Sequence, residues 1–341
     1  MTRNRIIFPE AYKAAVVKEQ VEAPGENDVI VRTQFSTISP GTERANFTGD
    51  PNVSGAAGPS VSFPRSCGYS SAGIVLEVGA NVRTVKPGDR VICYWGVHAD
   101  INRVPENRVV KIEYGNVDLR EASALFIATF PMAAIRKTRL EVGESCMVMG
   151  LGLLGQFAVR IAKAAGAVPV IACDPIQSRR EDALKGGADF VFDPMKPGFA
   201  DEVKRLTGGG VNSAIEVTGF GAGLDETLDC MAKMGRVALL GCTRSSDFTI
   251  DYYRKVHFPG IELLGAHTLA RPENESYPGH FTHCDDLRAL IRLCAYNRID
   301  VNSMLSELHS PAECQEVFDR LAYDKNFPIC VQFDWREDLN V

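Results

Sequence analysis

A glycine-rich turn between an apolar strand and a helix constrains the fold of this chain more than any other segment. The apolar run Cys146–Met149 leads into Gly150–Gly155, whose glycines have the spacing G-x-G-x-x-G, and the next residues, Gln156–Ala165, predict a helix. A second apolar run, Val168–Cys173, ends at Asp174, about 20 residues after the turn. This order predicts a dinucleotide-binding βαβ unit, in which the helix N-terminus faces a pyrophosphate and the acid faces a ribose.

The composition argues against several classes of protein. The 341 residues suffice for two domains, and the formal net charge of -6, without a basic tract, disfavours nucleic acid or an anionic membrane as a partner. No apolar stretch approaches the roughly 18 residues of a transmembrane helix, and residues 1–9 lack the features of a signal peptide. The ten cysteines are scattered, with no C-x-x-C, which indicates reduced thiols in a cytoplasmic protein.

Two sequence patterns divide the chain. Short segments rich in β-branched residues alternate with turns up to about residue 120. Strands are predicted there at Val29–Gln34, Ala72–Val78, Arg90–Tyr94 and Arg108–Ile112. Strands then alternate with helices, which predicts an α/β domain with a doubly wound parallel sheet. Its strands are predicted at Cys146–Met149, Val168–Cys173, Phe190–Phe192, Ser213–Val217, Arg236–Leu240 and Ile261–Gly265.

Helices are predicted on both sides of this sheet region in the sequence. A helix over Glu121–Lys137 precedes it, and Pro131 should break or kink that helix. Two helices, Asp285–Tyr296 and Ala312–Tyr323, and a strand at Pro328–Phe333 follow it. Because this tail is too short to form a domain, we expect it to rejoin the β-rich N-terminal part.

Five segments carry a resemblance to a known family: Ala72–Gly79, Lys86–Val91, Val148–Gln156, Glu216–Gly219 and Gly235–Val237. Over nearly its whole length the chain resembles the medium-chain dehydrogenases/reductases, the superfamily of zinc alcohol dehydrogenases and sorbitol dehydrogenases. The resemblance implies a GroES-like catalytic domain of residues 1–125 and 268–341, a Rossmann domain of residues 126–267, and a cleft between them. It also implies a homodimer or homotetramer, joined through strands beyond Leu240.

The segments that bind zinc in this family differ here. Pro40 stands where zinc members have the cysteine of a C-G-T-D segment, Tyr69 and Ser70 stand where they have the last two residues of G-H-E, and the third ligand position falls near Phe126. None of these is a good zinc ligand, and the cysteines of the family's structural zinc lobe are also missing. The resemblance therefore implies no metal. In these segments the chain is similar to zinc-lacking dehydrogenases of sugars, polyols or inositols and to hydroxyethyl-bacteriochlorophyllide dehydrogenase.

The cofactor is predicted to be NAD. The carboxylate of Asp174 would accept hydrogen bonds from the ribose hydroxyls and repel the 2′-phosphate of NADP. Arg179 and Arg180 complicate this prediction, since arginine is the usual partner of that phosphate, although both could belong to a solvated helix start. The resemblance places further residues beside the nicotinamide. The predicted cofactor residues are Gly150, Gly152, Leu153, Leu154, Gly155, Asp174, Arg179, Val217, Thr218, Gly241, Cys242 and Ala266.

Without zinc, a side chain must take the proton that an alcohol loses as hydride leaves. Thr42 keeps the hydroxyl of the family's proton relay, whereas Ala45 replaces the relay histidine. Tyr69 is the first candidate to bind the substrate hydroxyl, and the alternative is an aromatic side chain that only shapes the site. As a base it would need a cationic neighbour, because a phenol ordinarily has a pKa of about 10.

Two more titratable residues are candidates for proton transfer. Glu43 follows the relay threonine and could act as a base, with an ion pair to Arg44 or another arginine as the alternative. His98 precedes a predicted strand, and its imidazole suits proton transfer, with a buried structural role as the alternative.

The polar loop after the last strand of the parallel sheet is long for a simple connection. Its His267 is a further catalytic candidate. The predicted substrate-binding residues are Tyr94, Tyr277, His280 and His283. The last two histidines, three residues apart and followed by a cysteine, also allow a metal site, but no second cluster of ligands accompanies them.

The sequence therefore predicts a zinc-independent, NAD-dependent enzyme that oxidises a secondary hydroxyl of a sugar, polyol or cyclitol, or reduces the corresponding carbonyl. Two alternatives stay open. A zinc-free quinone or enoyl reductase needs no stabilised alkoxide, but such relatives usually prefer NADPH, which Asp174 disfavours. A non-catalytic NAD-binding protein is disfavoured by the retained Thr42 and by the histidines of the polar loop.

Overall fold

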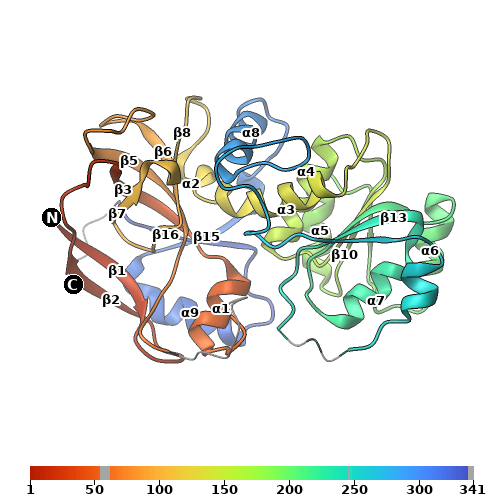
Figure 1. Cartoon of the computed structure of the whole chain (residues 1–341). Coiled ribbons are helices and arrows are strands. Elements are labelled where there is room, and N and C mark those ends of the chain that lie inside the picture. The colour runs from red at the N-terminus through yellow and green to blue at the C-terminus, as the bar shows by residue number, and fades with distance from the viewer. Residues whose placement is uncertain (54–61, 245, 247, 337–341) are drawn as a thin grey trace. The chain divides into compact units, whose positions relative to one another are not determined.

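The structure is a computed structural model that describes residues 1–53, 62–244, 246 and 248–336, and the chain divides into two units (Figure 1). Unit 1 consists of the described residues among 1–127, 287–296 and 305–341. Unit 2 consists of those among 128–286 and 297–304. Two of the crossings between the units lie inside helices, α3 (Leu125–Lys137) and α8 (His283–Ala295).

Unit 1 is built on two mostly antiparallel sheets. In the smaller sheet, β1 (Thr2–Phe8) lies between β2 (Ala15–Gln20) and β4 (Arg65–Ser66). The larger sheet has the order β15-β16-β3-β5-β6-β8, and β7 also pairs with β3. Its strands are β3 (Asp28–Thr37), β5 (Ser70–Val78), β6 (Arg90–Tyr94), β7 (Ile101–Pro105), β8 (Val109–Lys111), β15 (Leu305–His309) and β16 (Cys330–Asp334).

Four phenylalanine rings join the two ends of the chain in the core of unit 1. Phe8 of β1 packs on Phe47 of α1 (Pro40–Thr48) and on Phe318 of α9 (Cys314–Tyr323), with ring centroids 5.3 and 4.8 Å apart. Phe333 of β16 packs on Phe318 at 6.0 Å. Because burial of these rings stabilises the fold, the C-terminal tail lies against the N-terminal strand, as expected from the sequence.

Unit 2 is built on six parallel strands in the order β11-β10-β9-β12-β13-β14 (Figure 1). Numbered along the chain, this is the order 3-2-1-4-5-6 of a doubly wound dinucleotide-binding sheet. The strands are β9 (Cys146–Met149), β10 (Val170–Cys173), β11 (Phe190–Phe192), β12 (Val211–Glu216), β13 (Met231–Leu239) and β14 (Glu262–Gly265). The helices between them are α4 (Leu153–Ala164), α5 (Gln177–Lys185), α6 (Phe199–Thr207) and α7 (Gly221–Asp229).

Every side chain of β9 and β10 is buried, which indicates that both faces of this sheet are covered. Such strands are continuous apolar runs rather than alternating ones, which is why they were visible in the sequence. The predicted α/β fold, a GroES-like β-rich part with a doubly wound parallel sheet, is confirmed.

The helix predicted over Glu121–Lys137 is two helices, α2 (Leu119–Ala122) and α3. Pro131 does not break the helix, because α3 continues through it, and the break lies at residues 123–124 instead. Proline removes one backbone hydrogen bond from a helix. Every residue from 125 to 135 is buried, and this packing outweighs the lost hydrogen bond.

The unit boundary near the C-terminus differs from the predicted domain boundary, because residues 268–286 and 297–304 belong to unit 2. Arg271 holds the first segment: its guanidinium donates to a backbone carbonyl of α3 at 2.7 Å and pairs with the Asp286 carboxylate at 3.1 Å. Arg160 of α4 holds the second segment, donating to one of its backbone carbonyls at 2.8 Å. Side-chain contacts between such distant segments leave no periodic pattern in the sequence.

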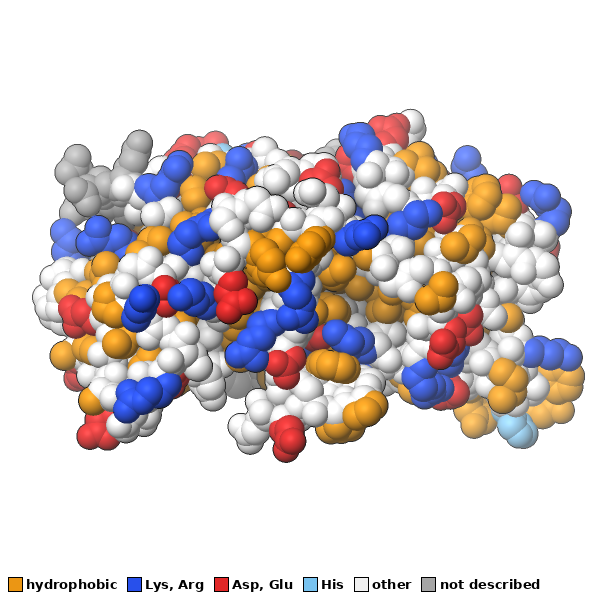
Figure 2. Space-filling model, turned by 90° about the horizontal axis from the view of Figure 1, so that it is seen from above, with side chains coloured by type: hydrophobic (Ala, Val, Ile, Leu, Met, Phe, Trp, Pro, Cys, Tyr) orange, Lys and Arg blue, Asp and Glu red, His pale blue; other side chains and the backbone are white. Residues whose placement is uncertain are grey.

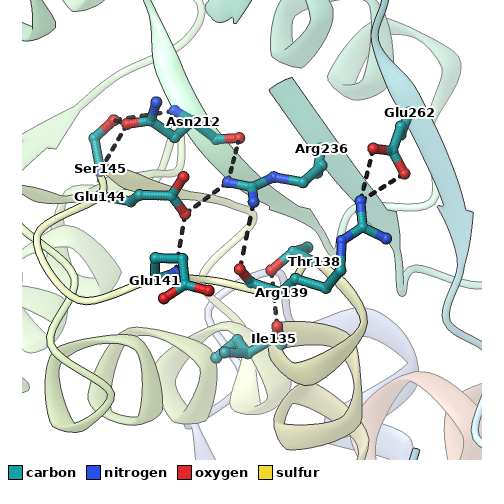
Figure 3. A network of polar contacts seen from close by, with 9 residues as sticks. All are labelled: Ile135, Thr138, Arg139, Glu141, Glu144, Ser145, Asn212, Arg236 and Glu262. Carbon is teal, nitrogen blue, oxygen red and sulfur yellow. Dashed lines mark hydrogen bonds and ion pairs between the residues drawn. The ribbon is translucent and has the colours of Figure 1, made fainter. Parts of the chain in front are cut away.

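A polar network fastens the strands of unit 2 at the end opposite the glycine-rich turn (Figure 3). Arg236 of β13 pairs with Glu144, just before β9, at 2.6 Å, and donates to the backbone carbonyls of Arg139 and Asn212 at 3.3 and 3.4 Å. Arg139, which follows α3, pairs with both carboxylate oxygens of Glu262 in β14 at 2.6 and 2.7 Å. The network therefore links three neighbouring strands to the start of β9 and the end of α3.

Charged and hydrophobic side chains are interspersed over the face shown in Figure 2. Across the described residues, no helix combines the length and the apolar character needed to cross a membrane. All ten cysteines lie in the described part of the chain as free thiols, and eight are buried. Burial raises the pKa of the Cys93, Cys146 and Cys330 thiols to about 12, so these thiols stay protonated and unreactive.

Candidate functional site

The glycine-rich turn has the geometry of a phosphate-binding loop. Gly150 has a φ of +95°, and a Cβ on Gly155 would lie 1.9 Å from the Gly150 carbonyl oxygen, so both positions require glycine. A Cβ on Gly152, in contrast, would meet no atom within 4 Å. Helix α4 begins directly after Gly152 with no side-chain cap, so its first N–H groups are available to an anion. This open approach fits the pyrophosphate of a dinucleotide.

Asp174 stabilises the glycine-rich turn through hydrogen bonds to the backbone. Its carboxylate is 4% exposed and accepts hydrogen bonds from the backbone N–H groups of Leu151 and Ile176, both at 2.8 Å. Arg179 lies 3.7 Å from one of the same carboxylate oxygens. Asp174, which favours NAD, and Arg179, which could favour NADP, are therefore neighbours that form an ion pair.

The loops after β12 and β13 pack together at the carboxyl edge of the same sheet. A Cβ on Gly150 would lie 3.0 Å from the Thr218 methyl group, and a Cβ on Gly241 would lie 2.3 Å from the Gly219 nitrogen. The structure thus brings together the turn, Thr218 and Gly241. Cys242 next to them is exposed, and Ala266 after β14 is 2% exposed.

Glu216, at the end of β12, was missing from the predicted site. One of its carboxylate oxygens accepts hydrogen bonds from the backbone N–H and the hydroxyl of Thr218, and burial raises the pKa of this carboxyl. Glu216 therefore fixes the loop 217–219. An acid that ends an apolar strand was the signal that could have identified it.

The positions expected for zinc ligands lie in unit 1, and aromatic side chains occupy two of them. The rings of Tyr69 and Phe126 are in contact, with centroids 5.9 Å apart. The Tyr69 hydroxyl donates a hydrogen bond to the hydroxyl of Ser39, which directly precedes Pro40 at the start of α1. The fourth residue, Ser70, donates to a backbone carbonyl at 2.6 Å and is 1% exposed.

Two further rings complete an aromatic cluster of Tyr69, Tyr94, Trp95 and Phe126. Trp95 lies 5.3 Å from Tyr69 and 5.0 Å from Phe126, measured between ring centroids. Tyr94 stacks on Phe126 at 4.7 Å, and its hydroxyl donates to the Asn107 carbonyl. Tyr94, predicted to bind substrate, is 5% exposed, so its hydroxyl holds a loop of unit 1 instead.

This arrangement does not fit a zinc ion. Zinc sites in proteins are made of Cys, His, Asp and Glu, and these positions offer one phenol, one serine hydroxyl and two rings or apolar groups. In the part of the chain that the structure describes, no group of three or more His, Cys, Asp and Glu side chains could hold a metal ion.

Glu43 and His98, two separate candidates for proton transfer, are partners in one buried chain. One Glu43 oxygen accepts the Ser39 backbone N–H at 2.9 Å, and the other lies 2.9 Å from His98 Nε2. His98 Nδ1 lies 2.7 Å from the Ser36 hydroxyl, which also accepts the Trp335 indole N–H at 2.8 Å. With Glu43 1% and His98 0% exposed, this pair positions Ser39 rather than meeting a substrate directly.

The alternative that Glu43 pairs with Arg44 or another arginine is wrong, because its two carboxylate oxygens bond Ser39 and His98. Arg44 is exposed and donates to the Ala322 backbone carbonyl of α9 at 3.2 Å, whereas Glu43 is buried. Thr42 lies in the first turn of α1, half-buried and three residues from Ser39.

The candidate catalytic and substrate-binding residues of the polar loop in unit 2 do not form one cluster. His267 is exposed and its Nδ1 accepts the Leu269 N–H at 3.2 Å. Tyr277 and His280 face each other across a tight bridge, with rings 4.9 Å apart. His283, the first residue of α8, lies with Nδ1 3.0 Å from a threonine hydroxyl of α3. Burial and the nearby Arg271 lower the pKa of His283 to about 3, so its imidazole is neutral at pH 7.

Two family models match the chain. The model described as an alcohol dehydrogenase GroES-like domain matches residues 25–114, and the model described as a zinc-binding dehydrogenase matches residues 154–279. Together they cover more than half of the chain.

Relatives with assigned activities match most of the chain. D-guloside 3-dehydrogenase of Escherichia coli (strain K12) is 29% identical over 285 residues, which are 78% of this chain and 81% of the relative. L-threonine 3-dehydrogenase of Pyrococcus horikoshii is 28% identical over 288 residues, 74% of this chain and 79% of the relative.

Solved structures agree with the fold of the whole chain. An Escherichia coli oxidoreductase/dehydrogenase of unknown specificity has a TM-score of 0.85 at 18% identity. A Sinorhizobium meliloti zinc-binding dehydrogenase bound to NADP has a TM-score of 0.80 at 20% identity, and an Escherichia coli alcohol dehydrogenase complexed with NADH has 0.81 at 15%. Each comparison covers 98% of this chain and 99% of the other. The chain belongs to the medium-chain dehydrogenase/reductase superfamily.

Proposed function

We propose that this protein is a zinc-independent, NAD-dependent dehydrogenase that oxidises a secondary hydroxyl of a sugar, polyol or cyclitol, or reduces the corresponding carbonyl. The observation that carries the proposal is the contact between Tyr69 and Phe126 at the positions expected to bind zinc. The relatives named D-guloside 3-dehydrogenase and L-threonine 3-dehydrogenase support chemistry at a hydroxyl-bearing carbon.

The residues of unit 2 fit a nicotinamide dinucleotide. The open face of Gly152 and the uncapped start of α4 would hold the pyrophosphate. The Asp174 carboxylate would accept hydrogen bonds from the ribose hydroxyls. When bound, NAD supplies the acceptor for the hydride. The Asp174 carboxylate repels a 2′-phosphate, and the nearby Arg179 is attracted to that carboxylate, which supports NAD over NADP.

The residues of unit 1 would handle the proton. Without a metal, a side chain must receive the proton of the alcohol. In our proposal the Tyr69 hydroxyl binds the substrate hydroxyl, takes its proton and passes its own proton to Ser39, its hydrogen-bond partner, while the Ser39 hydroxyl releases its proton to water. Glu43 fixes Ser39 through its backbone N–H, and His98 fixes Glu43.

A second function is favoured by one observation. The aromatic cluster also suits a flat apolar substrate, which a zinc-free quinone or enoyl reductase would take. Such an enzyme needs no proton acceptor for an alcohol, so the Tyr69–Ser39 hydrogen bond would have no role in it.

A substrate panel separates the two functions. NAD reduction is measured with sugars, sugar acids, inositols and polyols, with NADP in parallel, and NADPH oxidation is measured with quinones and enones. We expect turnover of one class of hydroxyl compound, faster with NAD than with NADP. Quinone or enone reduction with no oxidation of any hydroxyl compound would reject the proposal in favour of the reductase.

A further inference from the structure

We propose that Glu216 is a positioning residue of the dinucleotide site, which sets the affinity for the cofactor by holding the loop of residues 217–219 against the glycine-rich turn. The inference rests on the proposed function only through its cofactor and involves neither the substrate nor zinc. The proposed chemistry uses this buried carboxylate at no step.

The loop 217–219 lies where the strand order of the parallel sheet reverses. β9 and β12 are neighbours in the order β11-β10-β9-β12-β13-β14, and the chain builds outwards from them in both directions. Doubly wound sheets bind their ligands at this point, beyond the carboxyl ends of the strands. The glycine-rich turn follows β9 and the loop 217–219 follows β12, so both border the place where the fold binds a dinucleotide.

The Glu216 side chain accepts hydrogen bonds from three donors of this loop. One carboxylate oxygen accepts the Thr218 N–H at 2.7 Å and the Thr218 hydroxyl, and the Gly219 N–H lies 3.3 Å from both oxygens. Glu216 is 3% exposed, and its neighbours in register on β9 and β13 are the uncharged Met149 and Leu239. A buried carboxylate requires such partners, so the stability of this charge is tied to the conformation of the loop.

Thr218 connects the carboxylate to the glycine-rich turn. Its hydroxyl donates to Glu216 and accepts the Phe220 N–H at 3.1 Å, at the start of α7. Its methyl group lies against the turn, because a Cβ on Gly150 would come within 3.0 Å of it. A displacement of Thr218 would therefore change the packing of the turn that is proposed to hold the pyrophosphate.

The other side of the loop is packed as closely. Gly219 has a φ of +68°, and a Cβ there would lie 2.7 Å from the Cys242 carbonyl oxygen in the loop after β13. The loop 217–219 is thus enclosed by two neighbouring loops, and the Glu216 carboxylate is the polar group that fixes its backbone from within the sheet.

The hydrogen bonds to the loop depend on the ionised form of Glu216. Protonation turns one carboxylate oxygen into a donor, which cannot accept from the N–H groups of the loop. Burial raises the pKa of this carboxyl, so protonation begins at a higher pH than it does for an exposed glutamate. The affinity for the dinucleotide should therefore fall as the pH is lowered from about 7 towards about 5.

Calorimetric titration with NAD measures the contribution of the carboxylate. We expect the Kd for NAD to rise about tenfold in Glu216→Ala, where three donors lose their acceptor, and about threefold in Thr218→Val, which keeps the methyl group. Glu216→Gln keeps one acceptor oxygen and should restore most of the affinity. The double variant Glu216→Ala/Thr218→Val should bind no more weakly than Glu216→Ala, because the two residues act through one hydrogen bond.

Asp189→Ala is the matched control. The Asp189 carboxylate accepts the Val170 N–H at 2.8 Å and pairs with Lys163 at 2.7 Å, at the amino end of β10 rather than at the carboxyl end. Its loss should lower the stability measured by urea denaturation without NAD and leave the Kd unchanged. A Kd that rises as much in Asp189→Ala as in Glu216→Ala would overturn the inference, and so would an unchanged Kd in Glu216→Ala and Thr218→Val.

The pH dependence of the Kd gives a reading that a purely structural carboxylate would not produce. The wild type and Glu216→Gln are titrated with NAD between about pH 5 and about pH 8. We expect the Kd of the wild type to rise at the acid end and that of Glu216→Gln to change less. Asp174 and Arg179 are present in both proteins, so the difference belongs to Glu216. Equal profiles would overturn the inference, even if Glu216→Ala does not fold.

The titrations also separate this inference from the function on which it rests. They involve no turnover, so the inference can fail while the dehydrogenase stands. Binding of NADP and not NAD by the wild type would reject NAD as the proposed cofactor, and the same variants would then be compared by their Kd for NADP. Binding of neither dinucleotide would overturn both proposals.

Discussion

Tyr69 is the residue on which the proposed proton transfer depends. Its ring packs against Trp95 and Phe126, and its hydroxyl donates to Ser39. Tyr69→Phe keeps the ring and removes the hydroxyl, so the variant should fold and should bind NAD as the wild type does. We expect kcat for the hydroxyl substrate to fall about 10²-fold or more, the usual effect of losing a general acid–base group. An unchanged kcat would remove Tyr69 from the mechanism.

At the scale of single residues, the sequence supplied the right residues but not their partners. Tyr69, Glu43 and His98 were each identifiable from their position in a motif or from their chemistry. Glu43 and His98 are 55 residues apart, and their hydrogen bond depends on how α1 and the segment before β7 pack. No local pattern reports such a contact, which is why an arginine, and not His98, was considered as the partner of Glu43.

At the scale of elements, the network around Arg236 predicts a clear stability effect. The Arg236 side chain is 13% exposed and joins β13 to Glu144 and to two backbone carbonyls. Arg236→Gln should therefore lower the free energy of unfolding by about 1–3 kcal/mol, because the partly buried Glu144 carboxylate and the two carbonyls lose their hydrogen bonds to the guanidinium. Urea denaturation measures this change.

The control for this prediction is an exposed ion pair on the same unit. Arg254 pairs with Asp251 at 3.1 Å, but its side chain is 82% exposed. Arg254→Gln should change the free energy of unfolding by no more than about 0.5 kcal/mol. Equal losses in the two variants would show that the network in Figure 3 does not hold the strands together.

The elements of unit 2 were more predictable than those of unit 1. β9 and β11 have the predicted bounds, because both are short apolar runs, and β9 is buried on both faces. β1 and β2 were missed, since they carry charged residues such as Arg3 and Glu19, which pair across the strands. α3 continues through Pro131 because of its burial, a tertiary effect that propensity does not contain.

At the scale of the whole molecule, the fold and the dinucleotide turn follow from order and spacing along the chain, whereas the unit boundary and the aromatic cluster depend on packing. Residues 268–286 belong to unit 2 through the buried pair of Arg271 and Asp286, which joins a loop to the start of α8. Trp95 gave no signal in the sequence, because neither its conformation nor its contact with Tyr69 is visible before the strands are placed.

The central claim is that this protein, a member of a superfamily that includes zinc alcohol dehydrogenases, works without zinc. The most direct measurement is turnover of the substrate found in the panel before and after treatment with a strong chelator, with the zinc content of the purified protein determined by mass spectrometry. We predict far less than one zinc per chain and unchanged turnover after chelation. A stoichiometric zinc, with activity lost on chelation and restored when zinc is added back, would contradict the account.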